Sequence, residues 1–404
     1  MRVKLLDTYE KDAAKYFYRT RHLRLEHHGA IFETPLRALN NTDFNAKATA
    51  PSIAVLRSPI SGIFKNLNRG EVEDLLTTNS VAERMIASIE AFSQKMQYSD
   101  YVFADIQPPR NAIETILASD KTKEKFLRIA FKIQKEAGMK YISVPWLRLS
   151  TERTLEEYRR IEHESEEEPV FFLDCAADPS QLKEISDYLS TLVDTERIHI
   201  VGVRYTPARK AIASYDALWE AFRDRNVAVI LSDVPRFEQD AGNLSGVHMN
   251  QFVLGDILSP KVSRNRPKGI KEDSASQGNV AREAIDEEEL PPVQADIHSI
   301  LRFFDRKSLT VNPILGEPRE RWVERVLMDL DEPQAKLALE HYQEAAVDDD
   351  KLRALNAFSR VHESVSSEKE FAVSRELIGK GEAEEYIKGK TVLDHELKST
   401  RKRL

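Results

Sequence analysis

Three aspartates occupy positions in the sequence from which a carboxylate can take part in chemistry. Asp105, Asp174 and Asp233 each come at the end of a short apolar run, where a buried strand would deliver a polar side chain. Carboxylates placed there can act as nucleophile, as general base, or as acceptor for the N–H groups of a substrate. A single aspartate at a strand end more often caps a helix or closes a turn. Because three occur together, we predict a site that contains them.

The elements that would position these aspartates alternate along the chain. Predicted strands at 101–104, 141–144, 169–173, 198–203 and 227–231 are separated by predicted helices at 122–137, 155–163, 179–192 and 208–223. Continuous apolar strands between amphipathic helices indicate parallel strands covered on both faces. The series favours an α/β fold with a (β/α)8 TIM-type barrel, with a doubly wound sheet as the alternative. In a barrel, the carboxyl ends of the strands surround the active-site mouth.

The rest of the chain divides into an opening hairpin and a C-terminal part of different character. Alternating residues around Gly29 predict the hairpin, followed by a strand at 52–56 and a helix at 70–96. We predict a barrel domain over 1–258, a linker or insertion over 259–295 rich in charge, glycine and proline, and a helical region over 296–404. The expected C-terminal helices are 297–304, 320–330, 334–346, 351–361 and 368–378, before a basic tail at 398–404.

Composition limits the classes of function. The net charge of −8 gives no overall attraction to nucleic acid, so such a partner would need a local basic patch. The one cysteine, Cys175, excludes an intramolecular disulfide and a thiolate metal cluster. No run approaches the roughly 20 apolar residues that span a bilayer, so we expect a cytoplasmic protein without membrane contact.

Other residues give weaker signals. Trp146 either lines a pocket, where it would stack on a base, or packs in the core. His27 and His28 lack partners at metal-ligand spacing and fit a surface turn, while His199 lies in a predicted strand. The sequence has no phosphate-binding glycine fingerprint, no Gly-x-Ser-x-Gly elbow and no His-Glu-x-x-His motif.

Four segments, taken in order, resemble the tRNA-guanine transglycosylase superfamily. Leu25-Glu-His-His-Gly29-Ala-Ile-Phe-Glu33-Thr34-Pro35 is similar to the family's opening hairpin, and Asp105-Ile-Gln-Pro108-Pro109 to its "DECPP" or "DIPTPP" motif. Ile200-Val-Gly202-Val203-Arg-Tyr-Thr206-Pro207 resembles the "MGVGTP" segment, and Ser232-Asp233-Val-Pro235-Arg236 stands about where the family has "FDCVMPTR". The resemblance rests on the ordered set and implies a barrel.

The resemblance implies a reaction in which one base of a polynucleotide is exchanged for another. Asp233 would attack C1′ of the nucleotide and form a covalent glycosyl-enzyme intermediate, and Asp105 would accept hydrogen bonds from guanine or a 7-deazaguanine. The expected substrate is DNA or tRNA, with the target base single-stranded or flipped out. The remaining expected substrate-binding residues are Gln107, Trp146, Asp174, Gly202 and Arg236.

The sequence also departs from the family's pattern. It has no counterpart of the "DSGG" motif between Ser52 and Ser99, which in the family supplies a general acid/base aspartate. The family's zinc motif of three cysteines and a histidine is absent, so we expect no metal and no cofactor. Two alternatives stay open: a non-catalytic barrel that binds nucleic acid or a protein, and an unrelated barrel enzyme for a small metabolite. A homodimer or a partner protein is also left open.

Overall fold

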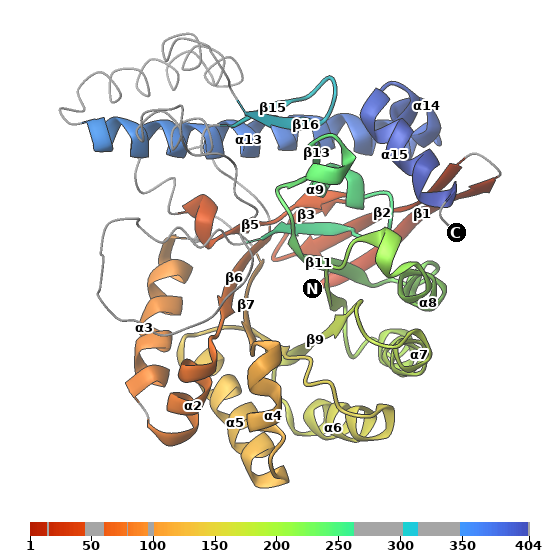
Figure 1. Cartoon of the computed structure of the whole chain (residues 1–404). Helices are drawn as coiled ribbons and strands as arrows, with labels where there is room; N and C mark the ends of the chain where they lie inside the picture. Colours follow the sequence, from red (N-terminus) through yellow and green to blue (C-terminus); the bar gives the residue numbers. More distant parts are fainter. Residues whose placement is uncertain are drawn as a thin grey trace.

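The structure is a computed structural model that describes residues 1–13, 16–44, 60–78, 80–95, 101–261, 302–313 and 348–402. Its centre is a parallel sheet with helices on the outside (Figure 1). The predicted strand 52–56, helices 320–330 and 334–346, and the linker beyond Lys261 lie outside the described residues.

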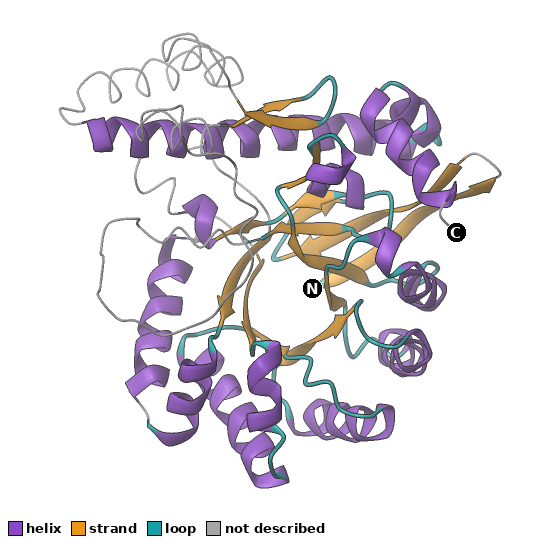
Figure 2. Ribbon diagram, in the orientation of Figure 1, coloured by secondary structure: helices purple, strands orange, loops and turns teal. Residues whose placement is uncertain are grey.

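The parallel sheet closes into a barrel, which confirms the predicted fold and excludes the doubly wound sheet. Its strands are β4 (Leu36–Arg37), β5 (Leu39–Asn40), β6 (Ile60–Asn66), β7 (Tyr101–Gln107), β8 (Tyr141–Val144), β9 (Glu168–Asp174), β10 (Ile200–Arg204), β11 (Ala228–Val234) and β14 (Ile257–Pro260). β4 pairs with β14 and β5 pairs with β6, so the segment around Ala38 joins the two edges of the sheet. Counted as one interrupted strand, β4 and β5 make the nine paired segments an eight-stranded barrel (Figure 2).

Helices cover the outside of the barrel. They are α2 (Arg69–Thr77), α3 (Ser80–Lys95), α4 (Ile113–Ile116), α5 (Asp120–Glu136), α6 (Thr151–Glu164), α7 (Pro179–Asp194), α8 (Ile212–Phe222) and α9 (Gly246–Asn250), with short 3-10 turns η1 (Arg110–Ala112), η2 (Ala208–Lys210) and η3 (Gln239–Ala241). Ser119, Ser150 and Asp178 accept hydrogen bonds from backbone N–H groups of the first turns of α5, α6 and α7. The single helix predicted over 70–96 is the pair α2 and α3.

The barrel interior is apolar over most of its height. Its residues are Leu36, Ala38, Ile60, Phe64, Tyr101, Phe103, Tyr141, Val170, Phe172, Ile200, Ala228, Ile230 and Ile257. They recur at every second position of each strand, so the intervening residues face the surrounding helices. Those outward residues form two further apolar clusters with the helices.

An antiparallel sheet closes the amino-terminal end of the barrel. It consists of β1 (Arg2–Ala13), β2 (Tyr16–His27) and β3 (Ala30–Glu33). His28 and Gly29 form the turn between β2 and β3 with φ of 48° and 84°, which confirms the predicted hairpin. Val3, Leu23 and Leu25 belong to the same apolar cluster as the barrel interior. This end of the barrel is therefore filled.

The C-terminal part packs on the barrel through a long helix. Its elements are β15 (Arg302–Asp305), β16 (Thr310–Pro313), α13 (Asp348–Gly379), α14 (Ala383–Lys388) and α15 (Thr391–Lys402). β15 and β16 form a small sheet with β12 (Phe237–Glu238) and β13 (Leu244–Ser245), which come from the segment between β11 and β14. The expected helices 351–361 and 368–378 are parts of the continuous α13, which crosses above the barrel in Figure 1. The helix expected over 297–304 is wrong where the structure describes it, because β15 pairs with β16 there.

One apolar cluster joins the barrel to this C-terminal part. Tyr18 and Phe252 of the barrel side pack with Phe304, Tyr386 and Leu397. None of the helices in the described part of the chain has the length and apolar character that crossing a membrane requires.

Candidate active site at the mouth of the barrel

A polar layer lies above the apolar interior at the carboxyl ends of the strands. Moving two residues along each strand replaces an interior apolar residue by a polar one, as in Phe103 to Asp105 and Phe172 to Asp174. The layer comprises Asp105, Ser143, Asp174, Arg204, Ser232 and Ser259. The strand register places these residues at the same height in neighbouring strands, since Arg204 pairs with Asp174 on one side and with Ser232 on the other.

Asp105 is the most deeply placed carboxylate of this layer. Asp105 is 2% exposed, and the side-chain amide of Gln107 donates a hydrogen bond to Asp105 Oδ1 over 2.5 Å. Burial raises the pKa of Asp105 to about 7, against the lowering effects of the Gln107 hydrogen bond and the Arg204 charge. The charge of Asp233 raises it further. Asp105 therefore exchanges a proton near neutral pH.

Asp233 reaches the mouth because the strand changes its course. Strict alternation would turn Asp233 outward, because Ser232 belongs to the interior layer. Instead the pairing of β11 with β14 shifts between Leu231 and Val234, and Asp233 has a φ of 59°. Arg204 Nη2 lies 3.4 Å from Asp233 Oδ2, and the Asp233 side chain is 20% exposed. Asp233 is thus paired with Arg204, and the charges of both residues act on Asp105.

Asp174 has structural partners as well as a place in the layer. Its Oδ1 accepts a hydrogen bond from Ala176 N over 2.9 Å, which closes the turn after β9. Its Oδ2 lies 3.2 Å from Arg148 Nη2. Arg148 has a φ of 56°, so both ion pairs at the mouth include a residue in the left-handed region.

The remaining predicted substrate residues do not present side chains to this mouth. Trp146 is 3% exposed and packs with Tyr158 and Phe171 in the layer between barrel and helices. At Gly202, a Cβ would lie 2.5 Å from the ring of Phe172, so that ring fills the space beside the glycine. Arg236 turns towards α13.

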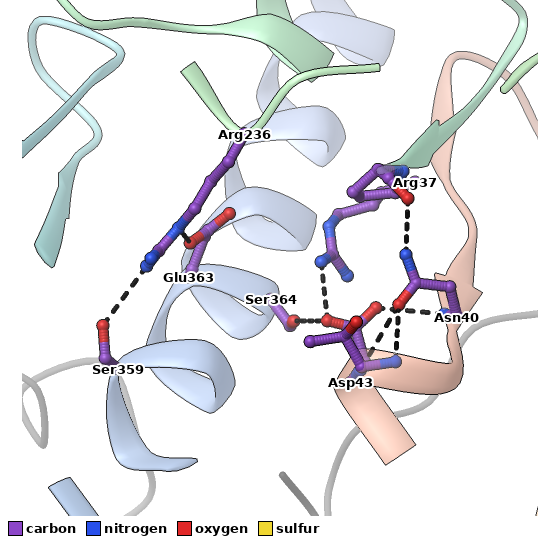
Figure 3. A network of polar contacts seen from close by, with 9 residues as sticks. Arg37, Asn40, Asp43, Arg236, Ser359, Glu363 and Ser364 are labelled. Atoms are coloured by element: carbon purple, nitrogen blue, oxygen red, sulfur yellow. Dashed lines mark hydrogen bonds and ion pairs between the residues drawn. The ribbon is translucent and has the colours of Figure 1, made fainter. Parts of the chain in front are cut away.

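Arg236 contacts two residues of α13 (Figure 3). Its Nε pairs with Glu363, and its Nη2 lies 3.2 Å from Ser359 Oγ. On the same side of the barrel, Arg37 Nη2 lies 2.8 Å from Asp43 Oδ1, and Ser364 also contacts Asp43. The long helix therefore packs beside the mouth through a charged network.

Several buried polar atoms at the mouth lack a hydrogen-bond partner among the described residues. They are Gln107 Oε1, Ser143 Oγ and Ser259 Oγ, and their residues are at most 3% exposed. A buried polar group without a partner costs about 1–3 kcal/mol, so a polar ligand that pairs with these atoms gains affinity. Within the described ranges, no cluster of His, Cys, Asp and Glu has the arrangement of a metal site.

Sequence reasoning missed two arginines of the site. Arg204 follows Gly202 by two residues in a buried strand, so the period of two would have placed it in the interior. Arg148 had no comparable signal, because its position depends on a left-handed backbone. No protein-family model matches this chain, and no curated protein is similar enough to it to count as a match.

Proposed function

We propose that this protein is a base-exchanging transglycosylase that replaces guanine in DNA or RNA with a 7-deazaguanine. The observation that carries the proposal is that buried Asp105 interacts electrostatically with both members of the Asp233–Arg204 ion pair. It gives one buried carboxylate that titrates near neutral pH beside a second, more exposed one. Retaining displacement at a sugar carbon uses two carboxyl groups in such different states.

In this proposal Asp233 is the nucleophile. An oxygen of its carboxylate forms a bond to C1′ while the bond from C1′ to the base nitrogen breaks, and the electron pair leaves with the base. The nitrogen of the incoming base then attacks C1′, passes its proton to the Asp105 carboxylate left by the first step, and releases the Asp233 carboxylate. Arg204 orients Asp233 before the attack and balances the negative charge of the mouth.

Asp105 has the second role. In its neutral form it donates a proton to the departing base, and as a carboxylate it accepts hydrogen bonds from the N–H groups of guanine. This assigns to Asp105 the acid/base function for which the sequence offers no "DSGG" motif. Gln107 Oε1 and Ser143 Oγ are further partners for the base edge.

The substrate of this proposal is a polynucleotide whose target base is unstacked. Asp105 is buried in the polar layer at the mouth, so a base inside a duplex has to be flipped out to reach it. The resemblance of the four ordered segments supports a guanine or 7-deazaguanine as the exchanged base. We place the reaction in the cytoplasm and assign it no cofactor.

A second candidate is a non-catalytic barrel that binds nucleic acid or a protein. Arg204 lies close enough to Asp233 to weaken it as a nucleophile, and the Phe172 ring fills the space beside Gly202. Trp146, a candidate for base stacking, is buried between barrel and helices.

Trapping of a covalent adduct separates the two candidates. The protein is incubated with labelled DNA or tRNA and with guanine or a 7-deazaguanine, and adducts that survive denaturation are detected. We expect an adduct that is lost in Asp233→Asn, which tolerates the left-handed backbone better than alanine does. Asp187→Asn, on the exposed face of α7, is the matched control. No adduct and no base incorporation with either polynucleotide would favour the non-catalytic barrel.

A further inference from the structure

Four arginines converge where α13 packs beside the mouth of the barrel. Arg37 ends β4, Arg236 follows β11, Arg302 begins β15, and Arg360 lies on α13. Ser359 links two of them: its hydroxyl is 3.2 Å from Arg236 Nη2 (Figure 3) and donates to the backbone oxygen of Arg302 over 2.6 Å. We call these four residues the arginine cluster.

The arginine cluster carries more positive than negative charge. Among the described residues, the carboxylates within it are Glu363, paired with Arg236, and Asp43, paired with Arg37. Four guanidinium groups thus face two carboxylates, which leaves two positive charges in excess. The cluster supplies the local basic patch that the chain's overall charge of −8 does not.

One further carboxylate acts on the cluster from its edge. The charge of Glu368 affects Arg37, but Glu368 Oε1 lies 2.7 Å from Arg375 Nη2. It therefore does not cancel the excess.

Arg360 is the member of the cluster for which the described part of the chain offers no hydrogen-bond or ion-pair partner. Its side chain is partly buried. Burial, and after it the positive charge of Arg236, lowers the pKa of Arg360 to about 10. The same two causes lower the pKa of Arg302, whose guanidinium lies 3.9 Å from the ring centroid of Phe237. An anion bound here would relieve the repulsion between these groups.

We propose that the arginine cluster binds a backbone phosphate of the polynucleotide whose base enters the mouth. The inference rests on the proposed function for the identity of the ligand. Guanidinium groups bind phosphate oxygens through paired, charge-assisted hydrogen bonds, and Arg360 has its donors available. Arg236 follows Asp233 by three residues, and the proposal assigns the phosphate to the nucleotide whose sugar Asp233 attacks. The cluster would thereby fix the position of C1′.

The test measures binding without turnover, in full-length protein carrying Asp233→Asn. Fluorescence anisotropy follows a labelled single-stranded oligonucleotide, with and without the additional substitution Arg360→Gln. We expect Arg360→Gln to weaken binding about tenfold and to reduce the slope of log affinity against log salt by about one. Because Arg360 has no hydrogen-bond or ion-pair partner among the described residues and repels Arg236, the variant should melt no earlier than its parent.

Arg197→Gln is the matched control, with the same change of charge. Arg197 precedes β10 and therefore lies at the opposite end of the barrel. The phosphate site would be overturned if Arg360→Gln left the oligonucleotide affinity and the salt slope unchanged. It would also be overturned if Arg197→Gln lowered both equally.

Inorganic pyrophosphate distinguishes a polynucleotide site from a site for free phosphates. Binding of pyrophosphate that depends on Arg360, in a protein that binds no oligonucleotide, would overturn the assignment to a backbone phosphate. A failure of the proposed function can be distinguished from a failure of the phosphate site. Oligonucleotide binding that depends on Arg360 supports the site even if no adduct forms, whereas adduct formation undiminished by Arg360→Gln contradicts it.

Discussion

Asp105 and Asp233 carry the same functional group, yet the barrel gives them different surroundings. Asp105 continues the inward alternation of β7 and is enclosed, whereas Asp233 stands where β11 breaks its register and keeps contact with solvent. The left-handed backbone at Asp233 costs about 1 kcal/mol relative to a relaxed strand. Strained backbone conformations are concentrated at functional sites, so the strain at Asp233 supports a functional role for this residue.

The buried carboxyl of Asp105 should make stability fall as pH rises. Its pKa is raised from 3.8 to about 7, so the folded state retains a proton that the unfolded state loses. The stability is therefore complete below the unfolded value and decreases through the window up to about 7. Asp105→Asn removes this loss, and we expect it to stabilise the protein by about 2–3 kcal/mol at about pH 8 and by much less at about pH 5.

Urea unfolding at the two pH values measures this difference. Asp187→Asn, exposed on α7, should show no such dependence. An equal effect of Asp105→Asn at both pH values would show that Asp105 does not hold its proton near neutral pH.

At the scale of single residues, the sequence predicted which polar side chains lie at the ends of the barrel strands. Asp105, Asp174 and Asp233 were found because each closes an apolar run, and all three lie at the predicted mouth. Their partners were not found. Arg148 Nη2 lies 3.2 Å from Asp174 Oδ2. The contact depends on two neighbouring strands and on the left-handed backbone of Arg148 itself. For Trp146 the local sequence left two hypotheses open, a pocket residue or a core residue. The structure buries it between barrel and helices.

Among the elements, the barrel strands depend on glycines that make room for aromatic rings. A Cβ on Gly62 would lie 2.5 Å from the Phe64 ring and 2.8 Å from the Phe103 ring. Gly202 makes the same allowance for Phe172. At these two positions a small residue makes room for a large one, so that the rings fill the barrel interior.

Gly202→Ala should destabilise the barrel by overpacking. The added methyl group meets three carbons of the Phe172 ring at 2.5 to 2.6 Å, and we expect a loss of about 2–3 kcal/mol. Phe172→Leu in the same chain should recover part of the loss, because it removes the atoms that clash. A double-mutant cycle of urea unfolding gives the coupling between the two sites. Additive effects would show that the Phe172 ring does not occupy this space.

The elements that the sequence missed are those without periodicity of their own. β4 and β5 are only two residues each, and their place follows from pairing with β14 and β6 on either side. β15 was misread as part of a helix because its few apolar residues fit either period. The strands from β7 to β11 were predicted because their apolar runs are continuous and lie between helices with capping residues.

Across the whole molecule, two kinds of contact hold the C-terminal part on the barrel. Near the mouth, α13 packs through ion pairs and serine hydroxyls, whereas near its end it packs through Tyr18, Phe252 and Tyr386. His248 on α9 lies between them, stacked with Phe304 at 5.0 Å and Phe371 at 4.4 Å between ring centroids. Neither of its ring nitrogens has a partner among the described residues.

His248 should make this attachment sensitive to acid. Burial, followed by the charge of Lys390, lowers its pKa from 6.5 to about 3, so the folded state resists protonation. The stability is complete above 6.5 and is lost as pH falls towards 3. His248→Phe should remove up to about 4 kcal/mol of this acid-side loss.

Urea midpoints measured from neutral to acid pH check the prediction. His163→Asn, exposed on α6, keeps the acid-side loss of the parent if His248 is its source. An acid profile that His248→Phe leaves unchanged would assign the loss to other groups.

The hairpin sheet across the amino-terminal end has a kinetic consequence for the proposed reaction. With Val3, Leu23 and Leu25 filling that end, the mouth is the entrance and the exit for everything that reaches Asp233. The departing base must vacate the space before its replacement can enter. Initial rates measured against both substrates should then give parallel lines in double-reciprocal plots, the signature of a ping-pong order.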